Sequence, residues 1–218
     1  MHRLHVFAGT SISLRDAHAL WGNEWTVRPP IRRGDLEELC AASARSPTPR
    51  LIVILDGCFF TSAAVSIMEI REAIEQGWTV VGASSIGALR AVECRPLGMI
   101  GFGGVFRWLS LYKVEDDDEV AQTINPETYE PTSDAMVDIR AITKYFERQH
   151  VLTRAERSAI LSLSKSQYFP DRSVRTVLQH LTTTPSSDLR TLVSSFTPPK
   201  RRDAYDCCAF VRRRYSYR

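Results

Sequence analysis

The sequence has no long apolar run: no stretch approaches the roughly 20 consecutive apolar residues that a membrane-spanning helix requires. The first residues, MHRLHVFAGTS, lack the apolar segment of a signal peptide and are typical of a first β-strand. We therefore predict a cytoplasmic protein that does not act in a membrane.

Cysteine and histidine are scarce, and neither forms a recognisable site. The five cysteines are odd in number and include no C-x-x-C pair, so neither a disulfide framework nor a metal site is predicted. Cys58, just after a predicted strand end, is a candidate for a reactive thiol. None of the five histidines stands in a catalytic context after residue 85, which argues against a conventional Ser-His-Asp hydrolase.

The net charge of +3 is unevenly distributed along the chain. Residues 197–218 contain seven Lys or Arg and two Asp, so residues 1–196 carry a small negative charge. A slightly acidic body argues against a nucleic-acid partner for most of the protein. The basic end has two interpretations, a solvated and partly disordered terminus or a segment that grips an acidic partner or RNA.

Residues 51–95 predict the centre of the fold. Apolar runs at residues 51–55 and 79–83 are typical of buried parallel strands, and a helical segment follows each run. Further predicted strands and helices alternate before them, at residues 5–8, 14–21, 25–27 and 36–44. This alternation predicts a doubly wound, Rossmann-like α/β fold with a mainly parallel sheet.

The C-terminal third of the sequence predicts helices. We divide the chain into an α/β core at residues 1–145, a helical extension at residues 146–182, and a linker with a basic, partly disordered tail at residues 183–218. The Gly-rich residues 97–104 predict a turn and lack the frame of a nucleotide-binding loop, so no cofactor is expected. Helical patterns occupy residues 105–112, 135–149, a segment starting at Thr153, and residues 171–181.

Polar residues follow three predicted strands. Ser11, Asp56 and the pair Ser84-Ser85 each come just after a strand, so they should meet at the carboxyl edge of the sheet. The segment from Ala83 to Gly87 is close to the strand-turn-helix elbow G-x-S-x-G, which exposes a serine and aims helix amides at an anion. The alternative is that Ser85 simply caps the helix that follows.

We assign candidate roles to these groups and to their neighbours. Ser85 is the candidate nucleophile or oxyanion-hole element, and Asp56 or Glu69 is the candidate general base. Ser11, Ser84 and Gly87 are candidate binding residues. Arg33 and Arg90 are candidate binding residues as well, although Arg90 can instead pair with Glu93 on the helix surface.

The acid run from Glu115 to Glu119 needs an opposing charge. Five contiguous acids repel one another unless a cation, a basic neighbour or a basic partner faces them. No EF-hand spacing or histidine accompanies the run, so a metal is the least favoured of the three. We predict a basic partner inside the fold, with Arg90, Arg95 or Lys113 as candidates; a purely solvated face is the alternative.

Taken together and in order, several short motifs resemble the TfuA-like family. The similarity extends from about Leu4 to Ala141, with a weaker continuation at residues 164–178, and leaves out the basic tail. Each motif alone is weak, and the ordered set is specific. The motifs are residues 28–35 (RPPIRRGD), 56–59 (DGCF), 82–91 (GASSIGALRA), 97–99 (LGM), 114–121 (VEDDDEVA) and 131–140 (PTSDAMVDIR).

The resemblance implies a role in the modification of ribosomal peptides. TfuA-like proteins partner YcaO enzymes, which use ATP to activate a peptide amide, in backbone thioamidation. The resemblance implies that this chain releases sulfide from a thiocarboxylated, ThiS-like carrier protein, with the precursor peptide reached through the YcaO partner. That hydrolysis passes through an oxyanion, which helix amides after Ser85 would stabilise. Hydrosulfide is a good leaving group, so the missing histidine is less damaging than in amide hydrolysis.

The sequence departs from the family pattern at one place. The family's Trp-His-Lys-Glu-Ile corresponds here to Ser66-Ile67-Met68-Glu69-Ile70, so only Glu69 and Ile70 match. If the family's His or Lys is catalytic, this chain is instead a non-catalytic partner that recruits substrate or carrier to a YcaO cyclodehydratase. A third alternative is an unrelated α/β hydrolase that acts on a small ester.

Overall fold

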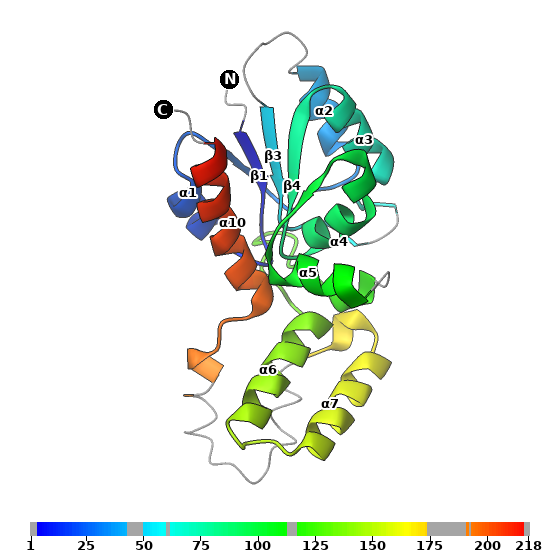
Figure 1. Ribbon diagram of the computed structural model, residues 1–218, viewed down its shortest axis with the longest axis vertical. Coiled ribbons are helices and arrows are strands. Elements are labelled where there is room, and N and C mark those ends of the chain that lie inside the picture. Colours follow the sequence, from blue (N-terminus) through cyan, green and yellow to red (C-terminus); the bar gives the residue numbers. More distant parts are fainter. Residues whose placement is uncertain are drawn as a thin grey trace.

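A five-stranded parallel sheet forms the upper part of the protein, with helices on both of its faces (Figure 1). The structure is a computed structural model, drawn in Figure 1. It describes residues 4–42, 50–59, 62–112, 117–173, 191 and 193–215. The strands lie in the order β2-β1-β3-β4-β5, and every neighbouring pair is parallel. They are β1 (Leu4–Phe7), β2 (Thr26–Arg28), β3 (Arg50–Ile54), β4 (Trp78–Gly82) and β5 (Ile100–Gly101).

The strand order confirms the predicted doubly wound fold. The order reverses between β1 and β3, and in such sheets ligands bind beside the carboxyl ends of the strands at this point. Ile52, Val53 and Ile54 of β3 are fully buried because helices cover both faces of the sheet. β5 was missed from the sequence, since its two residues lie within the Gly-rich segment that predicts a turn.

Two apolar clusters hold the helices on the sheet. On one face, the cluster is built from the strands and from α2 (Asp35–Ala42), α3 (Ile67–Glu75) and α4 (Ile86–Glu93). On the other face, the strands pack with α1 (Leu14–Trp21) and α10 (Pro199–Tyr215). A further helix, α5 (Gly103–Tyr112), packs against both α4 and α10.

Helix α10 corrects the prediction of a basic tail. Residues 199–215 form a helix whose side chains at 204, 207, 208 and 211 are at most 2% exposed and belong to the core of the sheet. The apolar stripe has helical spacing but is made of alanine, cysteine and valine between arginines, so composition alone hid it. The division of the chain into core, extension and tail otherwise remains a prediction.

A pair of helices, α6 (Met136–Arg148) and α7 (Arg154–Ser166), lies below the sheet and packs around its own apolar cluster (Figure 1). The helix predicted to start at Thr153 is α7, and a capping box of Thr153 and Glu156 is present at its start. Short 3-10 turns also occur among the described residues. Arg95–Leu97 follows α4, Phe169–Asp171 follows α7, and Asp117–Glu119 contains part of the acid run. Most of the helix predicted at residues 171–181 lies outside the described residues. Of the described helices, none has the length and apolarity needed to span a membrane.

Candidate functional site

A cleft of about 690 Å³ opens at the carboxyl edge of the sheet. One wall is the loop after β1, residues 9–13, which runs into the first turn of α1. Other walls come from residues between Gln122 and Asp138 and from the start of α10 at residues 198–201. Three parts of the chain that are distant in sequence therefore meet at the position where a doubly wound sheet binds its ligands.

Asp56 is fully buried behind the cleft wall and organises the loop after β1. Its Oδ2 atom accepts hydrogen bonds from the backbone N–H groups of Gly9 and Ser11, at 2.9 and 3.0 Å. Its Oδ1 atom accepts from the hydroxyls of Thr10 and Ser11, at 2.6 and 2.5 Å. Four donors fix the carboxylate, and the Ser11 side chain, which lines the cleft, is held against it.

Ser84 is the first of the two serines in the strand-turn-helix elbow and comes just before the motif serine, Ser85. Its φ of 70° lies in the left-handed region, which is rare for a residue other than glycine and is typical of strained functional turns. Its hydroxyl lies 2.5 Å from Ser11 Oγ and 2.8 Å from the backbone carbonyl of Lys200, within donating distance of both. Ser84, Ser11 and Asp56 thus form one chain of hydrogen bonds across the ends of β4, β1 and β3.

Ser85 lies outside this hydrogen-bonded chain. It is fully buried, and its hydroxyl donates to the carbonyl of Val120 at 3.3 Å. Two backbone amides at the start of α4 are also occupied, because the N–H groups of Ser85 and Gly87 donate to the carbonyl of Leu55 at 3.2 and 3.4 Å. The start of α4 is therefore packed against the end of β3 rather than open to the cleft.

Gly87 has a packing role that explains its place in the motif. A Cβ atom added at this position would lie 1.8 Å from the carbonyl oxygen of Ile54, so only glycine lets α4 approach β3 this closely. Gly87 does not line the cleft.

The remaining candidates, Glu69, Arg33 and Arg90, also lie away from the cleft lining. Glu69 completes the capping box of α3 with Ser66 and accepts a hydrogen bond from the N–H of Gly34 at 2.6 Å. Arg33 is exposed. Arg90 donates to the carbonyl of Val65 and forms an ion pair with Glu93 at 2.5 Å, which is the surface pairing anticipated as its alternative role.

Lys200 was not singled out from the sequence, yet it is the most unusual group in the cleft. Its side chain is 2% exposed, and its ammonium donates to the carbonyl of Val120 at 3.2 Å and to Gln122 Oε1. Both acceptors are neutral, and within the described part of the chain no carboxylate forms an ion pair with it. Burial lowers the pKa of Lys200, while the charges of Asp138, Asp56 and Asp134 oppose that shift.

Asp138 of α6 is the second group that sequence reasoning missed. It lines the cleft, and Oδ1 accepts the backbone N–H of Lys200 at 3.4 Å. Burial raises the pKa of Asp138 from the ordinary 3.8 to about 6, although the charge of Lys200 pulls it down. Among the described residues, no group of His, Cys, Asp and Glu side chains is arranged to hold a metal ion.

Replacing Asp138 by asparagine should change how stability depends on pH. The raised pKa means that Asp138 stabilises the folded state below about pH 4, and that this contribution is lost as the pH rises through about 6. Asparagine does not titrate, so the D138N variant should gain stability relative to the parent between these pH values. Thermal unfolding of both proteins across this range measures the effect; a constant difference in melting temperature would show that the pKa of Asp138 is not raised.

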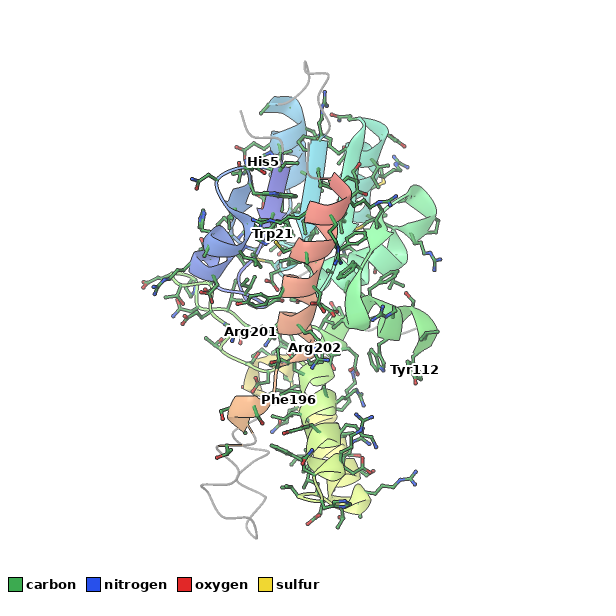
Figure 2. The ribbon with its side chains drawn as sticks, turned by 60° about the vertical axis from the view of Figure 1, so that its left-hand side comes forward. His5, Trp21, Tyr112, Phe196, Arg201 and Arg202 are labelled. Carbon is green, nitrogen blue, oxygen red and sulfur yellow. The ribbon has the colours of Figure 1, made fainter. Side chains whose placement is uncertain are left out.

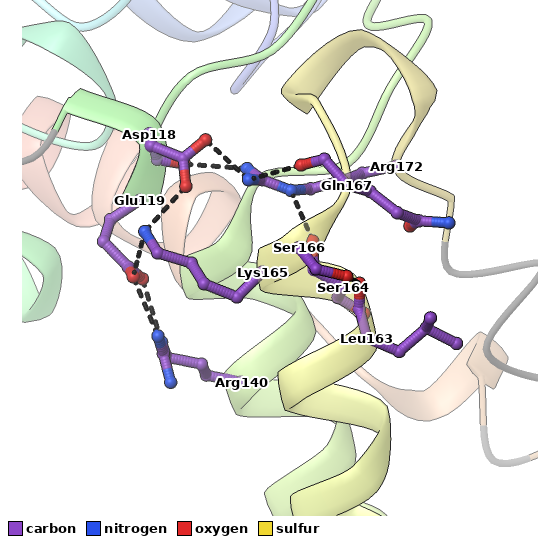
Figure 3. A network of polar contacts seen from close by, with 9 residues as sticks. All are labelled: Asp118, Glu119, Arg140, Leu163, Ser164, Lys165, Ser166, Gln167 and Arg172. Atoms are coloured by element: carbon purple, nitrogen blue, oxygen red, sulfur yellow. Dashed lines mark hydrogen bonds and ion pairs between the residues drawn. The ribbon is translucent and has the colours of Figure 1, made fainter.

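The acid run pairs with basic residues inside the fold, as predicted (Figure 3). The described partners are Arg140, Lys165 and Arg172, which were not among the candidates. Asp118 pairs with Lys165 at 2.6 Å and with Arg172 at 2.5 Å. Glu119 pairs with Arg140 and Lys165, at 2.8 and 3.1 Å. Burial alone would raise the pKa of Glu119, but the hydrogen bonds and charges of Arg140 and Lys165 lower it. The network ties the short turn that carries the acids to α6 and α7.

Among the described residues, the ion pairs of the acid run involve none of the predicted basic partners. Arg90 is paired with Glu93, and Lys113 falls outside the described residues, as do Glu115 and Asp116. The observed partners follow the run by 20 to 55 residues, whereas the candidates named from the sequence all precede it.

One comparison identifies relatives of this chain. The model of a family described as TfuA-like protein matches residues 56–173, more than half of the sequence. No curated protein matches the chain. The matched segment begins at Asp56, contains Ser84, Asp138 and the whole acid network, and ends before α10.

Proposed function

We propose that this chain, which belongs to the TfuA-like family, hydrolyses the thiocarboxylated C-terminus of a ThiS-like carrier protein. Membership of the TfuA-like family supports the broader statement that this chain has a role in YcaO-associated peptide thioamidation. The released sulfide would serve the YcaO partner, which would attach it to the backbone of the precursor peptide.

The observation that carries the proposal is the Ser11–Asp56 pair in the cleft wall. Ser11 lines the cleft, and its hydroxyl donates to a buried carboxylate at 2.5 Å. A hydroxyl that belongs to a cleft-lining residue and donates to a fixed base has the arrangement of an activated nucleophile. Neither Ser84 nor Ser85 lines the cleft, so in this proposal Ser11 takes the role of nucleophile that the sequence suggested for Ser85. Asp56 keeps the role of general base, because it accepts the hydrogen bond from the Ser11 hydroxyl.

The reaction proceeds in two balanced steps. Ser11 Oγ attacks the thiocarboxylate carbon while its proton passes to Asp56 Oδ1; the carbon–sulfur bond then breaks, and the sulfur takes that proton and leaves as hydrosulfide. Water next attacks the acyl-serine ester and gives one proton to Asp56, which passes it to Ser11 Oγ as the ester bond breaks; the other water proton stays on the carboxylic acid of the departing carrier. Across both steps, one thiocarboxylate and one water yield one carboxylic acid and one hydrosulfide.

Lys200 supplies the charge that this substrate needs. The thiocarboxylate is an anion and gains further negative charge on attack, so a buried ammonium beside it lowers the barrier. In this proposal, Lys200 takes the role that we predicted for the helix amides. The cleft also contains Arg15 and Arg201 together with acids, and the carboxyl of Asp138 can hold a proton near neutral pH.

The second candidate function is a non-catalytic partner of a YcaO protein. One observation favours it: Ile67 and Met68, which replace the family's His and Lys, are 42% and 50% exposed at the first turn of α3. Exposed apolar side chains at this place suit contact with another protein. Neither residue lines the cleft, however, so the departure leaves the hydrolytic groups intact.

Sulfide measurements separate the two functions. The pure protein is mixed with a thiocarboxylated ThiS-like carrier, and sulfide is followed with and without the YcaO protein. Hydrolysis predicts sulfide release by this chain alone. Sulfide at the background level, combined with faster turnover by the YcaO protein, would leave only the non-catalytic function.

A further inference from the structure

A second concave surface, of about 390 Å³, lies on the other side of the segment that leads into α10. We call it the basic groove, and define it by Lys144, Tyr145, Arg148, Phe196 and Arg202. Its lining includes two neighbouring aromatic rings, those of Tyr145 and Phe196, whose centroids are 5.5 Å apart. Figure 2 shows Phe196 just below the first turn of α10, where Arg201 and Arg202 project.

Among the described residues, the lining of the groove has three cations and no acidic residue. Lys144 is already paired with Glu147 at 2.6 Å. Arg148 and Arg202 are exposed, and within the described part of the chain neither has a carboxylate partner. Two guanidinium groups that form no ion pair with a described carboxylate, beside two aromatic rings, can bind carboxylates of a partner that lie next to an apolar side chain.

The basic groove and the cleft share one backbone segment. Pro198, Lys200 and Arg201 line the cleft, whereas Thr197, Pro199 and Arg202 line the groove. A single stretch of chain therefore separates the two, and from Pro199 on it is the first turn of α10, about 10–12 Å across with its side chains. A ligand in the groove can cross it with a few extended residues, at about 3.3 Å each.

We propose that the basic groove docks an acidic surface segment of the carrier protein whose C-terminal tail enters the cleft. The inference rests on the proposed function and adds the binding surface that selects the carrier. Arg148 and Arg202 bind carboxylates of the carrier, and Tyr145 and Phe196 receive an apolar side chain beside them. Because the tail then reaches Ser11 from a docked body, binding strength comes from the groove and chemistry from the cleft.

Charge reversal in the groove tests this inference. The R148E/R202E variant is compared with R213E/R214E, which changes the net charge equally but at the far, exposed end of α10. Binding of the carrier in its carboxylate form, which cannot be turned over, is followed by calorimetry. We expect the dissociation constant to rise about tenfold or more for R148E/R202E and to stay within about twofold of the parent for the control.

Kinetics with the thiocarboxylated carrier provide the second readout. R148E/R202E should raise KM and leave kcat near that of the parent, because docking and chemistry use different residues. Equal loss of binding in both variants, or parent-like binding by R148E/R202E, would refute the proposal that the basic groove binds the carrier. A parent that binds the carrier through the groove but releases no sulfide would refute the hydrolytic function and leave the docking surface standing.

Discussion

Replacing Ser11 by alanine is expected to lower kcat for sulfide release about 10³-fold, within the range for loss of a nucleophile or its proton transfer. Ser11 lines the cleft, and its hydroxyl donates to Asp56. Alanine removes the attacking oxygen and leaves the carboxylate with its three other donors, so the loop should keep its shape. Initial rates of sulfide release at saturating thiocarboxylated carrier measure the loss.

The neighbouring Thr10 offers a matched control. Its hydroxyl donates to the same oxygen of Asp56 at 2.6 Å, so T10A removes a hydrogen bond of the same kind without removing the proposed nucleophile. T10A should lose stability much as S11A does, by about 1 kcal/mol, but should lose far less activity. Equal activity losses in the two variants would mean that Ser11 only supports Asp56 and does not attack the substrate.

The largest effect on stability is expected at Arg172, whose side chain is 1% exposed. Its guanidinium donates to Asp118 Oδ1 and to the carbonyls of Ser164, Asp118 and Gln167, at 2.5 to 3.0 Å (Figure 3). Methionine fills much of the same volume but leaves these acceptors without their donor. Breaking a buried pair in this way typically costs about 3–5 kcal/mol, so urea should unfold R172M at a markedly lower concentration.

Arg157 on α7 is the control for this prediction. Its nearest carboxylate oxygen, on Glu147, is 3.8 Å away, and its side chain is 26% exposed. A partly exposed pair of this kind contributes at most about 1 kcal/mol, so R157M should unfold close to the parent. If R172M and R157M lose equally little stability, the acid run is only a solvated face and its network is not structural.

The sheet was largely predictable because its strands are apolar runs that end at turn residues. Residues 51–55 and 79–83 have the composition of buried parallel strands, and the helices after them have clear start signals. The short β5 and the packed α10 were not predictable in the same way. Two residues carry no periodicity, and the apolar stripe of α10 consists of small side chains among arginines.

The candidate site was predicted in part. Ser11 and Asp56 were placed together because both follow parallel strands, and the structure brings them together. Which serine of the elbow would join them depends on the backbone: with a φ of 70°, Ser84 turns toward Ser11, while Ser85 turns toward Val120. No motif distinguishes these two neighbours. The catalytic roles of Ser85 and Glu69 remain predictions that the observed hydrogen bonds do not support.

Lys200 and Asp138 show what local sequence signals omit. Lys200 stands among arginines in a basic stretch, so nothing in its neighbourhood indicates burial. The available signal was Asp138, an acid between the apolar Val137 and Ile139 in a helix that packs on the core. A charge in such a position requires a partner or a function, which sequence could raise as a question but could not answer.

The most direct test of the central claim is the mass of the carrier after reaction. The pure protein, without any YcaO protein, is incubated with excess thiocarboxylated ThiS-like carrier, and intact mass and sulfide are measured in the same samples. The proposal predicts that the carrier loses the mass difference between sulfur and oxygen, with one sulfide released per carrier, and that S11A slows both changes about 10³-fold. A carrier that keeps its sulfur in the presence of the folded parent protein would contradict the account.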